Sequence, residues 1–281
     1  AQAGHQVPGA DLRIGSDVPV GAGLASSHAL ECAVALALTG LAGVIVDHTE
    51  LALIVQRAEN GYVGAPTGAM DQMASLHGSD GHAVLFDAQA MTVELVPCDV
   101  GSAGLDLVVV DTHTTHHHAG GEYGTRRTTC HRAARRLGVA TLREVDDLDA
   151  ALARLADDSV AMRRVRHVVT ENARVVRAVA ALRANQWAAL GPLLTGSHVS
   201  LRDDYEVTVP QLDVAVEAAM DAGALGARMT GGGFGGSVLV LAERRGRPSV
   251  EDAVAATFAE RGWPAPTFRV VRPSRGAGRD G

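Results

Sequence analysis

The sequence predicts an α+β protein of two domains, and three observations lead to this expectation. The chain has 281 residues, of which 47% are apolar, enough for a substantial core and about two domains. A run of small residues at 101–104 lies between two strand-like patterns and is the best candidate boundary. Helices and then strands are expected before it, and long helices followed by strands beyond it. We therefore expect one domain over residues 1–100 and another over 101–281.

Within residues 1–100 the apolar spacing predicts the following elements. A strand is expected at residues 12–14, and a buried helix over 27–39 because nearly all of its surface is apolar. Glycines between residues 61 and 68 end a second, amphipathic helix. The remaining elements are that helix over 50–60 with Thr49 as its cap, a short helix over 69–76, and strands over 83–87 and 91–96.

Residues 101–281 show longer helical patterns. An apolar strand over 105–111 opens this half, and residues 275–281, which are small or charged, are expected to form a disordered tail. Between them we expect helices over 122–137, 162–184, 186–194, 210–222 and 249–261, and strands over 237–241 and 268–271.

Composition excludes several functional classes. The net charge is −7 and the arginines are scattered among acids, which is unlike the basic stripe of a nucleic-acid-binding protein. The sequence contains no apolar run of membrane-spanning length. Cys32, Cys98 and Cys130 show no paired spacing, which favours a reducing compartment. We expect small-molecule chemistry in the cytoplasm, with neither nucleic acid nor membrane as a partner.

A glycine-rich loop at residues 19–27 leads directly into the first predicted helix. Its backbone amides and the free N–H groups of the helix start point to one place, an arrangement that binds phosphate. A Walker loop requires a lysine, and all 25 basic residues of this chain are arginine, which excludes a P-loop NTPase. A tight turn with a serine cap is the alternative. In a phosphate site, Ser27 is the expected Mg²⁺ ligand.

Two further motifs are weaker indications of a binding site. Residues 230–236 contain G-x-G-x-x-G, but a strand pattern follows them where a dinucleotide fold needs a helix. A second glycine loop against backbone or phosphate, or a tight turn, is expected instead. His113 and the histidines at 116–118 could suggest a transition-metal site. Alternate residues of an extended segment point to opposite faces and no cysteine completes a ligand set, so a solvated loop is expected.

Four separated segments form one larger pattern: residues 19–27, 64–72, 120–127 and 200–207, the last followed by 228–236. In this order they resemble the galactokinases, within the GHMP kinases, and the similarity covers nearly the whole chain. The stretch Ser-Leu-Arg-Asp-Asp-Tyr-Glu-Val at 200–207 is specific to galactokinases. The resemblance implies a ribosomal-S5-domain-2-like N-terminal domain over 1–100 and a ferredoxin-like C-terminal domain over 101–281.

The resemblance also implies a function, the transfer of phosphate from ATP to the C1 hydroxyl of α-D-galactose with Mg²⁺, by a monomer. Ser27 and Glu59 match the Mg²⁺ ligands, Asp71 the proton acceptor beside the sugar, and Tyr123 a sugar contact. On their own, Asp71 would complement a helix dipole, Glu59 would be a surface acid and Tyr123 an amphipathic core residue. The positions matching the ATP-phosphate loop are Gly21, Ala22, Gly23, Leu24, Ala25, Ser26 and Ser27.

One part of the family pattern is not in the printed sequence. Galactokinases carry an N-terminal motif with an arginine near the transferred phosphoryl group and a Glu-His-Thr-Asp stretch that grips the sugar. We therefore expect the chain to lack the first strands of its N-terminal domain and to be inactive as printed. The alternatives are a kinase for an N-acetylgalactosamine-type sugar and a non-catalytic sensor of ATP and sugar. The presence of Ser27, Glu59 and Asp71 favours a kinase over a sensor.

Overall fold

The computed structural model describes residues 4, 6, 8–19, 21–64, 67–114 and 119–279, with residues 119 and 120 described by their backbone alone. These residues form two compact units. The first contains residues 24–99 and 272–279 with the described residues up to 19, and the second contains residues 21–23 and 100–271. The chain thus changes unit between residues 99 and 100, next to the boundary that the sequence predicts.

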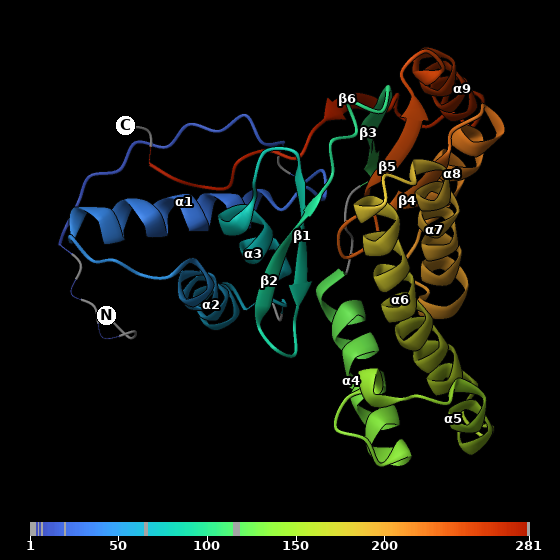
Figure 1. The fold of residues 1–281 in the computed structure, drawn as a ribbon, viewed down its shortest axis with the longest axis horizontal. Coiled ribbons are helices and arrows are strands. Elements are labelled where there is room, and N and C mark those ends of the chain that lie inside the picture. The colour runs from blue at the N-terminus through green and yellow to red at the C-terminus, as the bar shows by residue number, and fades with distance from the viewer. Residues whose placement is uncertain are drawn as a thin grey trace. The chain divides into compact units, whose positions relative to one another are not determined.

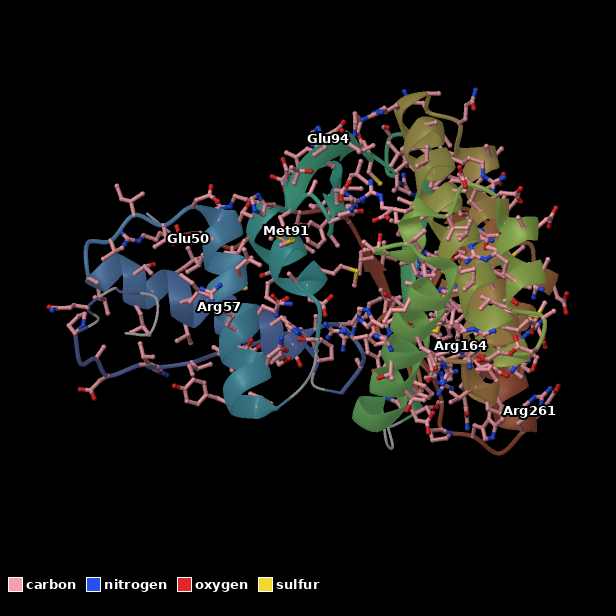
Figure 2. All side chains as sticks on the ribbon, turned by 90° about the horizontal axis from the view of Figure 1, so that it is seen from below. Glu50, Arg57, Met91, Glu94, Arg164 and Arg261 are labelled. Atoms are coloured by element: carbon pink, nitrogen blue, oxygen red, sulfur yellow. The ribbon has the colours of Figure 1, made fainter. Side chains whose placement is uncertain are left out.

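The described part of the first unit consists of helices followed by a β-hairpin (Figure 1). β1 and β2 are antiparallel, with His82 opposite Pro97. Leu51 and Val55 of α2 are buried, whereas Glu50 and Arg57 on the same helix are exposed and are labelled in Figure 2. The elements are α1 (Ser26–Leu41), α2 (His48–Ala58), a π-helical turn (Glu59–Val63), α3 (Met70–His77), β1 (His82–Asp87) and β2 (Thr92–Pro97).

The structure corrects two local predictions in this unit. Residues 12–14 are not a strand, because within the described residues no strand pairs with them and a strand needs a hydrogen-bonded neighbour. The cap of α2 is Asp47 and not Thr49: one Asp47 carboxylate oxygen accepts from the backbone N–H of Thr49 at 2.8 Å and of Glu50 at 3.3 Å.

The prediction of a disordered C-terminal tail is wrong for residues 275–279. The backbone N–H of Gly276 donates to Gly78 O at 2.7 Å, and that of Ala277 donates to Ser75 O at 2.6 Å. A Cβ on Gly276 would lie 2.8 Å from Leu76 O, so only glycine allows this close approach. The described residues after 271 therefore pack in the first unit, although the second domain expected from the sequence extends to residue 281.

The second unit is built on an antiparallel sheet with the strand order β4-β5-β3-β6. β3 lies between β5 and β6, which makes it a central strand and explains its apolar sequence. The strands are β3 (Leu105–Thr114), β4 (Gly226–Met229), β5 (Gly236–Glu243) and β6 (Thr267–Val271). The sequence did not predict β4, because a strand of four residues is too short for its apolar alternation to be recognised.

Helices complete the second unit and form two cores. Leu212 and Phe258 pack with the sheet, while Ala133, Leu155 and Val165 form a separate cluster between helices. Of the described helices, none is both long enough and apolar enough to cross a membrane. The helices are α4 (Ala119–Leu137), α5 (Leu148–Arg154), α6 (Ser159–Arg183), α7 (Trp187–Ser200), α8 (Pro210–Asp221) and α9 (Arg247–Glu260), with a 3₁₀ turn at Leu142–Glu144 and a π-helical turn at Leu201–Tyr205.

Candidate active site

The predicted phosphate loop leads into α1 without a side-chain cap. Ala25 precedes the helix in a left-handed conformation, with φ at 54°, and among the described residues no side-chain hydrogen bond caps the helix start. Ser26 and Ser27 lie inside the helix, so the alternative of a serine cap is wrong. The uncapped N–H groups of a 16-residue helix favour an anion at this end.

The first part of the loop, Gly21–Gly23, belongs to the second unit and packs there against residues 230–237. The buried Ser237 hydroxyl donates to Ala22 O at 2.6 Å. A Cβ on Gly231 would lie 3.1 Å from Gly23 O. Residues 230–235 connect β4 to β5, so the second glycine loop joins two strands and lies against backbone.

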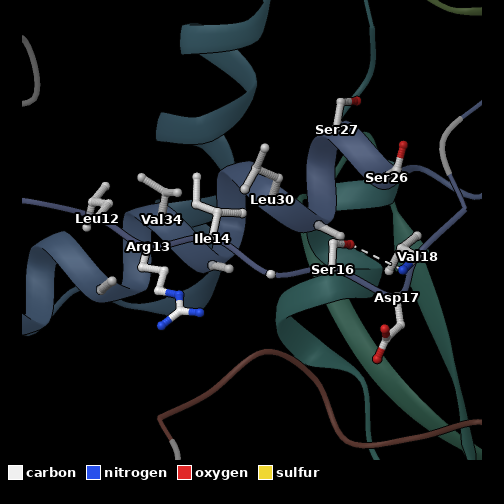
Figure 3. A pocket seen from close by; sticks show the side chains of 14 residues that line it. Leu12, Arg13, Ile14, Ser16, Asp17, Val18, Ser26, Ser27, Leu30 and Val34 are labelled. Carbon is white, nitrogen blue, oxygen red and sulfur yellow. Dashed lines mark hydrogen bonds between the residues drawn. The ribbon is translucent and has the colours of Figure 1, made fainter.

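In the first unit, a cavity of about 650 Å³ lies between residues 12–18 and α1 (Figure 3). Its walls are largely apolar, with Leu12 and Ile14 on one side and Leu30 and Val34 of α1 on the other. Ser26 and Ser27 line the same cavity at the start of the helix.

Glu59 is the centre of the polar contacts in the first unit. It begins the π-helical turn after α2 and is only 4% exposed, which contradicts its default assignment as a surface acid. Its Oε2 accepts from Thr67 Oγ1 at 3.0 Å and from Gln72 Nε2 at 3.3 Å. Its Oε1 accepts from the Ser27 hydroxyl at 3.5 Å. The two residues predicted to bind Mg²⁺ are therefore neighbours.

His28 lies between Glu59 and Asp71. It is 7% exposed, and its Nε2 is 2.6 Å from Glu59 Oε2, close enough for an ion pair although the angle is not that of a hydrogen bond. Its Nδ1 is 3.4 Å from Asp71 Oδ2 and 3.4 Å from Ser27 Oγ. Asp71 itself is in the first turn of α3, with 34% of its side chain exposed. The structure thus brings Ser27, Glu59 and Asp71 together around one histidine.

Burial and the charge of a neighbouring carboxylate raise the pKa values of two acids in this cluster. Burial raises the pKa of Asp71, and the charge of Glu59 raises it further, while His28 opposes both. Burial and the charge of Glu59 likewise raise the pKa of Glu31. Glu31 Oε2 is buried and has no hydrogen-bond partner in the part of the chain that the structure describes. Carboxylates whose pKa values are raised by burial and by a neighbouring charge are typical of functional sites, which makes this cluster the candidate site of the first unit.

The other predicted sugar contact lies in the second unit. Tyr123 is on α4 and is 38% exposed, so it is not the core residue of the alternative assignment. Of the histidine cluster, residues 116–118 lie outside the described residues. His113 Nε2 is 2.8 Å from Thr267 Oγ1, and no group of three or more His, Cys, Asp or Glu side chains in the described ranges is arranged to hold a metal.

The galactokinase-specific stretch 200–207 is held by arginines within the second unit. Arg164 of α6, labelled in Figure 2, forms an ion pair with Glu206 at 2.5 Å. Arg126 donates to the backbone oxygens of Tyr205 at 3.3 Å and Glu206 at 2.7 Å. The Tyr205 ring stacks on His167 with 4.3 Å between centroids. These contacts fix a π-helical turn, a structural role that the linear motif did not reveal.

The sequence did not predict that His28, Thr67 and Gln72 belong to the site in the first unit. Glu59 is 31 residues from His28 and 13 from Gln72, so no local spacing connects them. One signal was present: His28 lies four residues before the buried Cys32, on the buried face of an apolar helix, where a polar side chain needs a partner.

Comparisons with known proteins agree with this description. Residues 1–79 match the GHMP kinases N terminal domain, and residues 178–260 match the GHMP kinases C terminal domain. The chain is 49% identical to a galactokinase of Streptomyces coelicolor over 280 residues, covering 99% of this chain and 72% of that protein. It is 44% identical to a galactokinase of Mycobacterium tuberculosis H37Rv over 275 residues, covering 98% and 76%.

Solved structures extend the similarity to the fold. The crystal structure of Lactococcus lactis galactokinase in complex with galactose superposes with a TM-score of 0.87 at 33% identity, covering 92% of this chain and 68% of that one. A homoserine kinase of Cytophaga hutchinsonii, 19% identical with a TM-score of 0.58, shares the fold alone. The α+β, GHMP-kinase-like fold predicted from the sequence is therefore confirmed, and the chain belongs to the galactokinase family of GHMP kinases.

Proposed function

We propose that this chain transfers the γ-phosphoryl group of ATP to the C1 hydroxyl of α-D-galactose. The observation that carries the proposal is the grouping of Ser27, Glu59 and Asp71 around His28. The Asp71 carboxylate is partly open to solvent, and the Ser27 hydroxyl points to the Glu59 carboxylate. The relatives described as galactokinases, and the galactose complex of one of them, support the choice of sugar.

Asp71 is proposed as the proton acceptor. A sugar hydroxyl is a weak nucleophile, so its proton passes to the Asp71 carboxylate while its oxygen forms the new bond to phosphorus. The bond between the γ-phosphorus and the bridging oxygen breaks, and ADP leaves with that oxygen. Burial raises the pKa of Asp71, which makes the carboxylate a better base than a fully solvated one.

Ser27 and Glu59 are proposed to hold Mg²⁺. The fit rests on Glu59 Oε1, which contacts the Ser27 hydroxyl while Oε2 receives the other donors, and on the buried, unpartnered Glu31 Oε2 nearby. Both ligands offer oxygen, which Mg²⁺ prefers, and two protein ligands are typical where phosphate and water complete the shell. Bound Mg²⁺ would neutralise charge on the phosphate oxygens.

Residues 21–27 are proposed to bind the phosphates of ATP through backbone N–H groups, and Tyr123 to contact the sugar. Support for the first comes from the uncapped start of α1, and for the second from the exposed position of the tyrosine on α4. Cys32, Cys98 and Cys130 are all free thiols, which supports a cytoplasmic location.

The test is a coupled assay of ADP release from the full chain with ATP and galactose, N-acetylgalactosamine or no sugar. The same assay is run on the chain joined to the family's N-terminal motif, since the resemblance assigns part of the sugar grip to it. Galactose-dependent release from either form supports the proposal. Release only with N-acetylgalactosamine, or ATP binding without any turnover in both forms, would replace it by one of the two alternatives.

The Asp71→Asn variant tests the chemistry in whichever form is active. Turnover should fall by about 10²- to 10⁴-fold, the usual contribution of a positioned base, with ATP affinity retained. Glu50→Gln is the matched control, because Glu50 is also an acid in the first turn of a helix in the same unit. Equal, small effects of the two changes would mean that Asp71 only complements a helix dipole.

A further inference from the structure

His28 has no role in the chemistry proposed above, yet it contacts three of its residues. It is buried on α1 and reaches Glu59 through Nε2 at 2.6 Å, and Asp71 and Ser27 through Nδ1 at 3.4 Å each. Burying an imidazole costs free energy unless charged or polar groups surround its nitrogens. The groups within reach of His28 all belong to the proposed site, and Nε2 contacts Glu59 by charge and proximity without hydrogen-bond geometry.

The two carboxylates depend on His28 to different degrees. Glu59 Oε2 also accepts hydrogen bonds from Thr67 and Gln72, so Glu59 is held from several directions. For Asp71, within the ranges that the structure describes, the contact with His28 is the one polar side-chain contact. Loss of the imidazole should therefore leave Glu59 Oε2 bound to Thr67 and Gln72 but Oε1 less firmly directed toward Ser27, and it should leave Asp71 free to turn.

We infer that His28 is a positioning residue of the kinase site, which holds the Asp71 carboxylate through Nδ1 and directs Glu59 Oε1 toward Ser27 through Nε2. This inference rests on the proposed function. The physical need follows from the charges: Glu59 repels both Glu31 and Asp71, and an imidazole lying between Glu59 and Asp71 separates these two carboxylates and restricts how each can turn.

Two conservative variants of His28 distinguish the role of Nδ1 from that of Nε2. The amide nitrogen of asparagine falls near the position of Nδ1, and that of glutamine falls near Nε2. His28→Asn should keep the Asp71 contact and most of the turnover. His28→Gln should keep the Glu59 contact but lower kcat by about 10- to 100-fold, the effect of a misplaced catalytic group. His28→Ala should lose both contacts.

The effect of His28 on the proposed Mg²⁺ ligands is measured by ATP binding, without turnover. Calorimetric titration of ATP at increasing Mg²⁺ gives the Mg²⁺ concentration needed for tight binding. That concentration should stay near the parent value in His28→Gln and rise by about 10-fold in His28→Asn and His28→Ala, the usual effect of losing a partner that orients a metal ligand.

His198 provides the matched control. It is buried as well, its Nδ1 accepts from the backbone N–H of Met229 at 3.2 Å, and its Nε2 is 3.1 Å from Asp213, so its partners are residues of the second unit with no proposed role in the chemistry. His198→Ala should lower the melting temperature without changing the Mg²⁺ requirement or kcat.

The outcomes distinguish this inference from the proposed function. A parent chain with neither Mg²⁺-dependent ATP binding nor galactose turnover, with or without the family's N-terminal motif, would overturn the proposed function and this inference with it. An active parent whose three His28 variants keep its kcat and Mg²⁺ requirement, or lose both equally as melting temperature falls, would overturn the inference alone. If His28→Ala does not fold, the opposite selectivities of His28→Asn and His28→Gln still decide.

Discussion

His167 should make the second unit sensitive to mild acid. The side chain is 7% exposed, its Nδ1 lies 2.9 Å from the Ser200 hydroxyl, and its ring stacks on Tyr205 at an interplanar angle of 23°. Burial lowers the pKa of His167 from 6.5 to about 4; Glu171 and Asp204 oppose this shift, and Arg174 and Arg228 add to it. The folded unit therefore keeps this imidazole neutral over a range where the unfolded chain protonates it.

The difference between the folded and unfolded pKa of His167 determines how the free energy of unfolding changes with pH. Between pH 6.5 and about 4 the unfolded state binds one proton more than the folded state, so the free energy of unfolding falls as pH falls. One pH unit is worth at most about 1.4 kcal/mol, so the loss over the whole window is up to about 3 kcal/mol. Above pH 6.5 the contribution is complete, and below about 4 it is gone.

The measurement is urea unfolding at several pH values, followed by tryptophan fluorescence. Trp187 and Trp263 are the two tryptophans of the chain and both belong to the second unit, so the signal reports on this unit. His167→Asn keeps a polar group near Ser200 but cannot titrate, and His131→Asn removes an exposed histidine as the control. The parent and the control should lose stability steeply below pH 6.5, and His167→Asn much less. Parallel pH profiles for all three chains would refute the reasoning.

Two further outcomes are expected. Ser27→Ala should raise the Mg²⁺ concentration needed for tight ATP binding, because a hydroxyl ligand is lost while the backbone N–H groups remain. Ser27→Thr keeps a hydroxyl group and should show the parent value. If a calorimetric titration shows no difference between the alanine and threonine variants, Ser27 does not bind Mg²⁺ and is only a residue of the helix. Gly226→Ala should destabilise the second unit by about 1–3 kcal/mol in urea unfolding, since its Cβ would lie 2.2 Å from Gly191 O, whereas Gly246→Ala, with 3.7 Å to its nearest atom, should cost less than about 0.5 kcal/mol. Equal midpoints for both glycine variants would contradict the close packing of α7 on β4.

The elements that the sequence predicted well are those whose apolar period repeats several times. α1, α6 and α8 contain buried residues over three or more turns, β1 contains a short apolar run, and the alternating residues 91–96 overlap β2. α5 and β4, with seven and four residues, are too short for a period to stand out. The segment 12–14 has a strand-like sequence but no paired neighbour among the described residues, and local sequence carries no information about partners.

The site shows the same division between local pattern and tertiary contact. Asp71 and the serines at the start of α1 belong to motifs in which the residue order itself carries the chemistry. The partners of Glu59 do not: Thr67, Gln72 and His28 reach it from a loop and two helices, and the sequence gives each of them an ordinary local explanation. Buried polar residues are satisfied by whatever the fold brings to them, so their pairing becomes visible only in three dimensions.

The carboxylates around His28 indicate a functional role for this cluster rather than a contribution to stability. Burial raises the pKa values of Glu31 and Asp71, so both carboxylates are less stable as anions in the folded chain than in the unfolded one. An amide side chain in place of one of them would remove this repulsion, so stability alone does not explain why both carboxylates are present. One histidine can offset only part of this repulsion, and a cation beside Glu59 Oε1 and Ser27 Oγ would offset more of it. Ligand binding and the stability of the first unit should therefore be coupled, because whatever binds the folded cluster and not the unfolded chain favours the folded state.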